Sequence, residues 1–248
     1  MTTHLYCVVA SNERVAPTGL AGLSGEAVRA LAVDNLVAWV SDVSRDIPLL
    51  FDGLRAHDAV VQAALDMGTT PVPARFGQRF NNDDACRAAL ASRAASVESL
   101  LAGMQGYVEM TLIITPSTKS MIRDLEPVIP EVFEPDTRGT GRKYLETLRR
   151  REMATGAVRQ AIDALALRLN DAVAGLARRV MAHDSTTPLP LRTISHLVAR
   201  GDLDAYRSAL ADVPGGREFR FLVIGPRAPY SFSALTDAGG AHGMKLAD

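Results

Sequence analysis

Five histidines are the residues with the widest chemical repertoire in this chain. They are His4, His57, His183, His196 and His242. No two of them have the H-x-x-x-H spacing that places metal ligands on one helix face, and no G-x-S-x-G, G-x-G-x-x-G or P-loop motif occurs. Folding can still bring distant histidines together, so a hydrolase centred on His57 or His196 stays open as an alternative. The sequence otherwise predicts no catalytic residue, cofactor site or metal site.

A second group with chemical potential is the basic and aromatic stretch around Gly77. Arg75 and Arg79 alternate there with Phe76 and Phe80. Two guanidinium groups beside a glycine can hold a phosphate or a carboxylate. However, neither a glycine-rich loop nor a Walker-type lysine accompanies them. We therefore expect a structural or protein-contact role for this stretch.

A third group follows the last predicted strand, which ends at Gly225. Pro226 and Pro229 fix φ and lack an N–H, so the chain beyond the strand is stiff. If it stays extended, Tyr230 and Phe232 point to the same side, because side chains alternate with period two. Two interpretations remain open. Either this aromatic ledge packs on its own domain, or it binds another chain together with Arg227 and Pro229.

Composition limits the classes of partner. The 27 basic and 28 acidic residues give a net charge of −1, which attracts neither nucleic acid nor an anionic membrane. Cys7 and Cys86 lack the spacing of a disulfide framework or a zinc site. No apolar run approaches the ~18 residues of a spanning helix. We expect a cytoplasmic protein that binds no nucleic acid and no membrane.

The elements of the first part of the chain form an α+β pattern. The expected strands are 5–10 and 36–43, and the expected helices are 52–67 and 82–101. Leu54 belongs to the apolar stripe of the earlier helix, and Asn81 or Asn82 can cap the later one. We assign an N-terminal α+β domain to residues 1–104.

The second part has a long helix at its centre. The expected strands are 107–115, 191–199 and 219–224, and the expected helices are 143–182 and 202–210. The helical stripe of the long helix is Val158, Ile162, Leu165, Leu169, Val173, Leu176 and Val180. A kink near Gly156, or a division into two helices, is expected. Residues 116–142 are predicted to be an irregular excursion. We assign a C-terminal domain to 105–235 and a flexible, extended tail to 236–248.

Four passages in this order resemble the gas vesicle GvpL/GvpF family of accessory proteins. They are Leu36 to Val43 after an N-terminal strand, Pro73-Ala74-Arg75-Phe76-Gly77, Gly106-Tyr107-Val108-Glu109-Met110, and Gly225-Pro226 with Pro229-Tyr230-Ser231-Phe232. The family's last motif typically has Trp and Pro where this chain has Arg227 and Ala228. The resemblance implies a non-enzymatic role in assembling gas vesicles, and a second domain with a ferredoxin-like sheet.

The resemblance also implies the partners. They are the main gas vesicle shell protein and other gas vesicle accessory proteins. The expected contact residues are Arg75, Phe76, Phe80, Arg227, Pro229, Tyr230 and Phe232. Replacing Tyr230 and Phe232 by alanine is expected to weaken binding of the shell subunit and to leave the fold intact. The main alternative is a small-molecule-binding regulatory module, because ferredoxin-like domains serve many functions.

Overall fold

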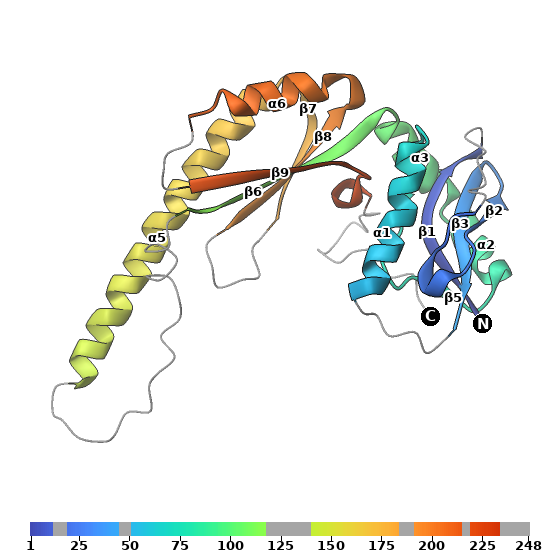
Figure 1. The fold of residues 1–248 in the computed structure, drawn as a ribbon, viewed down its shortest axis with the longest axis horizontal. Helices are drawn as coiled ribbons and strands as arrows, with labels where there is room; N and C mark the ends of the chain where they lie inside the picture. Colours follow the sequence, from blue (N-terminus) through green and yellow to red (C-terminus); the bar gives the residue numbers. More distant parts are fainter. Residues whose placement is uncertain (12–18, 45–50, 118–139, 184–190, 215–218, 234–248) are drawn as a thin grey trace. The chain divides into compact units, whose positions relative to one another are not determined.

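The computed structural model describes residues 1–11, 19–44, 51–117, 140–183, 191–214 and 219–233. The chain is α+β, as the sequence predicts, and forms two compact units with one antiparallel sheet each (Figure 1). The first unit contains residues 1–109 and the segment that begins at Pro226, and the second contains residues 110–225. Residues 226–232 therefore belong with the first unit, whereas the sequence analysis assigns them to the second domain.

The sheet of the first unit is centred on β1 (Thr2–Ala10). β1 pairs antiparallel with β3 (Leu36–Val43), and β3 pairs with β2 (Arg29–Val33). On its other side, β1 pairs with two short strands, β4 (Val72–Pro73) and β5 (Arg79–Phe80). The strand order is β2-β3-β1-β4, with β5 also beside β1. The central strand is buried from Thr2 to Val9, as expected for a strand with neighbours on both edges.

β2 is not predicted from the sequence pattern. It forms a hairpin with β3 through a turn at Asp34 and Asn35, and Asp34 has a φ of +49°. Two-residue hairpin turns need positive φ, which Asp and Asn tolerate better than most residues. The edge position that Pro71 and Pro73 predict is confirmed, because β4 is last in the strand order.

The first unit has α1 (Phe51–Asp66), α2 (Asp83–Ala91) and α3 (Ala94–Met104) among its described residues. The predicted cap of α2 is present, since the Ala85 N–H donates to Asn82 Oδ1 at 2.8 Å. The single helix expected over 82–101 is wrong. It breaks at Ser92, whose hydroxyl donates to the Ala89 carbonyl instead of leaving the backbone to continue the helix.

The second unit is built from β6 (Tyr107–Pro116), α5 (Thr140–Val173), β7 (Ala177–His183), β8 (Arg192–Ala199), α6 (Leu203–Ala211) and β9 (Phe219–Arg227). Its strand order is β7-β8-β6-β9. The helix expected over 143–182 is wrong at its end. Its helical stripe stops at Val173, and Val180 lies in β7, which pairs with β8. Gly175 follows the helix, where glycine commonly terminates it.

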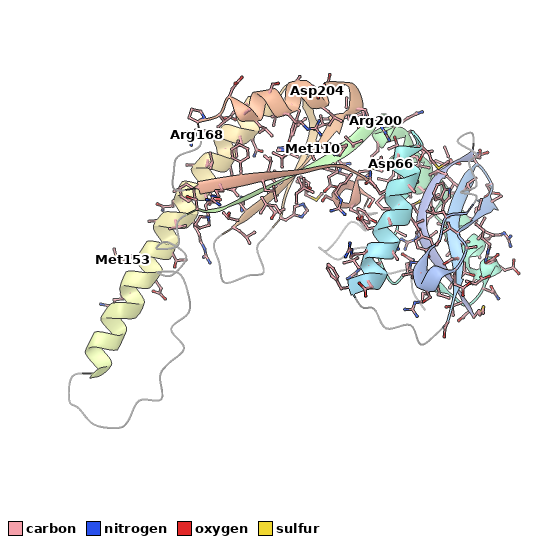
Figure 2. All side chains as sticks on the ribbon, viewed as in Figure 1. Asp66, Met110, Met153, Arg168, Arg200 and Asp204 are labelled. Atoms are coloured by element: carbon pink, nitrogen blue, oxygen red, sulfur yellow. The ribbon has the colours of Figure 1, made fainter. Side chains whose placement is uncertain are left out.

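α5 is a single helix of 34 residues that continues through Gly156 without the expected kink. Its C-terminal half provides the core contacts, and its N-terminal half extends past the sheet (Figure 1). Met153 on the extending half is 75% exposed, whereas Met110 on β6 is buried beneath the helices (Figure 2). The core residues of this unit are Met110, Leu112, Ile114, Ile162, Leu165, Ala166, Leu169, Val173, Ile194, Val198, Tyr206 and Leu210.

β9 continues to Arg227, so the expected end of the strand at Gly225 is wrong. Pro226 is tolerated because β9 is an edge strand, and along its outer edge the backbone N–H groups need no partner strand. The expected excursion at 116–142 and the tail at 236–248 lie largely or wholly outside the described residues. Among the helices that the structure describes, none is both long and apolar enough to cross a membrane.

Candidate partner-binding site

The C-terminal segment, defined as Pro226–Phe232, folds onto the first unit. Tyr230–Phe232 forms a 3₁₀ turn, η4, so the extended ledge, with both rings pointing to the same side, is not present. Phe232 is only 2% exposed, Ala228 is buried in the core, and Tyr230 packs against that core. The sequence leaves two interpretations open for these aromatic rings. In the structure the rings pack on the protein itself.

Polar contacts with Glu109 and Asp58 hold the C-terminal segment. The carboxylate of Glu109 accepts hydrogen bonds from the Ser231 N–H at 2.8 Å and from the Ser231 hydroxyl at 2.7 Å. The guanidinium of Arg227 donates to Asp58 Oδ2 on α1 at 2.6 Å. Glu109 is buried, whereas the side chains of Arg227 and Asp58 are 44% and 36% exposed. The Glu109 contact is therefore the stronger one, because solvent screens the other pair.

The stretch from Arg75 to Phe80 forms a turn and a short strand beside β1. The Gln78 N–H donates to the Arg75 carbonyl at 3.1 Å, and Gly77 has a φ of +88°, which side-chain-bearing residues rarely adopt. Arg75 is exposed, and Phe80 is half-buried opposite Thr3. The turn therefore presents Arg75 to solvent.

Phe76 points inward from this turn and contacts α1. Its ring lies against His57 with a centroid separation of 5.7 Å, and a Cβ on Gly53 would lie 3.1 Å from Phe76 Cζ. The absence of a side chain at Gly53 thus lets the ring approach the first turn of the helix. Asp58, on the same helix, binds Arg227. α1 consequently connects the two sequence stretches that we expected to bind partners.

The first turns of α1 carry exposed apolar side chains. Phe51 is 72% exposed and Leu54 is 45% exposed. The prediction that Leu54 belongs to the buried stripe is wrong: the buried positions of α1 are His57, Val60, Val61, Ala64 and Leu65. Phe51 is not assigned to this helix from the sequence, because the helix begins one residue earlier than expected. We define the α1 patch as Phe51, Leu54, Arg75 and Phe76.

Beneath the α1 patch lies a buried histidine pair. His4 Nε2 and His57 Nδ1 are 2.9 Å apart, and His57 Nε2 lies 3.1 Å from the Ala74 carbonyl. A carbonyl only accepts, so His57 Nε2 carries the proton and His57 Nδ1 accepts from His4 Nε2. The pair links β1, α1 and the residue that precedes Arg75.

Burial keeps both imidazoles neutral. It lowers the pKa of His4 to about 3, with a further contribution from the charge that His57 would carry, and it lowers the pKa of His57 to about 4. The second unit contains a comparable group. Burial lowers the pKa of His196 to about 4, and its two nitrogens lie 2.8 Å from Tyr206 Oη and 2.8 Å from Asn170 Oδ1.

These environments bear on the hydrolase alternative. His4, His57 and His196 are fully buried, so none of their side chains reaches a molecule bound at the surface. Every ring nitrogen of His57 and His196 is engaged within the protein. No cluster of three or more potential metal ligands occurs among the described residues. The three histidines thus have the environment of core residues, not of a general base.

Comparison with known proteins points to one family. The family model described as "Gas vesicle synthesis protein GvpL/GvpF" matches residues 2–234. Gas vesicle protein L2 of Halobacterium salinarum is 28% identical over 93% of this chain and 90% of its own length. Gas vesicle protein L of a Streptomyces species is 25% identical over 94% of this chain and 93% of its own length.

Solved structures resemble the fold. The crystal structure of gas vesicle protein GvpF from Microcystis aeruginosa has a TM-score of 0.68 and 17% sequence identity, over 94% of this chain and 99% of that one. GvpF from an Anabaena species also has a TM-score of 0.68, with 15% identity over 95% of this chain and 99% of that one. At such identities the likeness establishes the fold alone.

Proposed function

Because the chain belongs to the gas vesicle synthesis protein GvpL/GvpF family, we propose that it assists gas vesicle assembly by binding the main shell protein and other accessory proteins. The family places it among the accessory proteins of gas vesicles. The proposal adds a mechanism. The protein acts in the cytoplasm without catalysis and covers apolar surface of the shell subunit before or during polymerisation, when that surface would otherwise aggregate.

The observation that carries this mechanism is the α1 patch. Phe51 is 72% exposed and Leu54 is 45% exposed, although the other face of the same helix is buried in the core. Burying a large apolar side chain contributes about 1.5–3 kcal/mol, so two such residues are a substantial part of a binding energy. Arg75 is exposed on the turn whose next residue, Phe76, contacts α1, and its guanidinium can donate hydrogen bonds to a carboxylate or a carbonyl of the partner.

The seven expected contact residues divide into two roles in this proposal. Arg75, Phe80 and Arg227 retain exposed surface and contact the partner. The others, Phe76, Pro229, Tyr230 and Phe232, shape the surface from within, because they pack against the first unit or are buried in it. Asp58 is added to the set as the residue that ties Arg227 to α1.

We also propose that the second unit is a ferredoxin-like domain. Its elements follow the order β6-α5-β7-β8-α6-β9, which is the β-α-β-β-α-β sequence of that fold. The two central strands, β8 and β6, lie between β7 and β9. In this interpretation the domains are residues 1–109 with 226–232, and residues 110–225.

The test is co-purification of the tagged protein with the main shell subunit expressed in the same cells. Phe51→Ser with Leu54→Ser should reduce the recovered shell subunit about tenfold or more, since two apolar contacts are lost. Met67→Ser is the matched control, because Met67 follows the other end of α1 and is 43% exposed. Equal recovery with the double variant and the control would contradict the role of the α1 patch. No complex with any gas vesicle protein would contradict the assembly mechanism itself.

A further inference from the structure

The first unit contains a pocket that shares no residue with the α1 patch or the C-terminal segment. Its volume is about 350 Å³, and it lies where the end of β1, the β2–β3 turn, the residues after α1, and α3 meet. Pockets that bind small groups have volumes of roughly 300–1,000 Å³. This one is at the lower end of that range, large enough for a side chain or a small molecule.

The inner part of the pocket is apolar. Leu36 from β3 and Leu101 from α3 line it and are almost fully buried. The Ala10 and Ala102 side chains add small apolar surfaces. Such a lining suits an aliphatic chain, because methylene groups leave water as they enter.

Oxygen atoms are available around this apolar part. Thr70 is buried, and its hydroxyl oxygen accepts from the Gly106 N–H at 3.1 Å. The side chains of Asn35 and Gln105 each carry an amide oxygen. Among the described lining residues, Glu98 is the only ionisable one, so the pocket carries a negative charge.

The carboxylate of Glu98 keeps capacity for a ligand. Asn35 Nδ2 donates to Glu98 Oε1 at 3.3 Å, which is longer than the usual 2.7–3.2 Å of a strong contact. A carboxylate has about four acceptor positions on its two oxygens, so this contact uses only one of them. The Ser11 N–H donates to the Asn35 carbonyl at 2.9 Å and fixes the backbone of Asn35. The backbone of Asn35 is therefore fixed beside the pocket, and the Glu98 carboxylate remains able to accept further hydrogen bonds.

We propose that this pocket binds the alkylguanidinium group of an arginine side chain presented by a partner protein. The aliphatic stem fits the lining of Leu36 and Leu101, and the guanidinium pairs with Glu98. Arginine suits the site better than lysine because its planar head offers five N–H donors in a fixed fork, and the pocket provides several oxygen acceptors.

The inference is tested by titration of the ¹⁵N-labelled full chain, followed by two-dimensional amide NMR. The probes are N-acetyl-arginine-methylamide, its neutral isostere N-acetyl-citrulline-methylamide, and agmatine as a free small guanidine. We expect saturable shifts that centre on Ser11, Asn35, Thr70 and Gln105 with the arginine probe, weaken at high salt, and are absent with citrulline.

Two variants complete the test. Glu98→Gln keeps the shape and removes the charge, and should weaken binding of the arginine probe about tenfold or more. Glu26→Gln is the control, since Glu26 is exposed in the same unit and does not line the pocket. Equal shifts with citrulline, or undiminished binding by the Glu98→Gln protein, would overturn the proposal. Binding of agmatine without binding of the capped arginine would overturn the assignment to a partner's side chain.

Discussion

The two units differ in how the chain builds them. The second unit is continuous in sequence, and its residues come from 110–225 alone. The first unit is assembled from two separate stretches, because Ala228 and Phe232 fill the core that residues 1–109 begin. A continuous unit can complete its core from its own stretch of sequence, whereas the first unit needs residues 226–232. The C-terminal segment is thus first a part of the core of the first unit, and only its remaining exposed surface can bind a partner.

The two units also differ in how completely their buried histidines are hydrogen-bonded. In the second unit a single imidazole, His196, has both nitrogens engaged by Asn170 and Tyr206. In the first unit two imidazoles share one hydrogen bond, and His4 Nδ1 has no hydrogen-bond partner among the described residues. The first unit therefore has fewer hydrogen bonds per buried imidazole, since His57 also bonds the Ala74 carbonyl but His4 Nδ1 bonds none of the described residues, and this makes its core the more sensitive of the two.

Removal of residues 226–248 should have the largest effect, because it destabilises the first unit and leaves the second unit nearly intact. The first unit loses Ala228, Tyr230, Phe232 and the partner of Glu109, so we expect its free energy of unfolding to fall by more than about 5 kcal/mol. Amide hydrogen exchange measures both units in one sample. Protection in β1 and β3 should disappear and protection in β8 should remain. Retained protection in β1 would mean that the first unit is complete without the segment.

Phe232→Ala should have the next largest effect. Truncation of a fully buried phenylalanine leaves a cavity and costs about 3–5 kcal/mol. The variant with Tyr230→Ala in addition should lose more, so the expectation that this double change leaves the fold intact is replaced by one of destabilisation. Urea unfolding of the first unit measures the loss. Leu222→Ala is the control, because Leu222 is exposed on β9, and its cost should stay within about 0.5 kcal/mol.

Acidification should destabilise the first unit more than the second, because the first unit buries two histidines and the second buries one. The folded-state pKa values, about 3 and 4 in the first unit and about 4 in the second, lie below the ordinary value of 6.5. The unfolded chain therefore binds protons first, and stability falls as the pH drops from about 6.5 towards 4. Between pH 6.5 and pH 5 each histidine accounts for at most about 2 kcal/mol.

The expected acid-induced loss is thus about twice as large in the first unit as in the second. Residue-resolved hydrogen exchange at pH 7 and pH 5, corrected for intrinsic exchange rates, measures each unit separately. An equal loss in the two units would contradict the assignment of the effect to the His4–His57 pair.

The smallest effect concerns the two polar contacts of the C-terminal segment. Glu109→Ala removes a buried acceptor of two hydrogen bonds and should cost about 2–3 kcal/mol. Arg227→Ala breaks a partly exposed ion pair and should cost less than about 1 kcal/mol. Thermal unfolding of the two variants gives the ranking. A larger loss with Arg227→Ala would show that the ion pair, not the buried carboxylate, holds the segment.

Local patterns predict much of this fold. The strand at 36–43, the cap at Asn82 and the core stripe from Val158 to Val173 follow from alternation, capping chemistry and helical spacing. The failure at Val180 has a physical reason. Its spacing continues the helical stripe by coincidence, and only pairing with β8 makes residues 177–183 a strand.

The candidate site was less predictable because its contacts join distant residues. His4 and His57 are 53 positions apart, and Glu109 and Ser231 are 122 apart. Contacts between residues so far apart in the sequence cannot be inferred from local sequence patterns. The stretch at Arg75–Phe80 could be found from composition, but its attachment to α1 depends on the approach of Phe76 to Gly53. The exposure of Phe51 and Leu54 depends in turn on which helix face the sheet covers.

The divided construction of the first unit also sets an order of events during synthesis. A ribosome adds roughly 5–20 residues per second, so the intervening second unit takes roughly 6–23 s to make. Throughout this interval residues 1–109 have left or are leaving the ribosome, while Ala228 and Phe232 do not yet exist. Residues 1–109 therefore wait throughout the synthesis of the second unit before Ala228 can enter their core. During this wait the nascent first unit has an unfilled core, and its exposed apolar residues are accessible to chaperones and proteases until residues 226–232 are made.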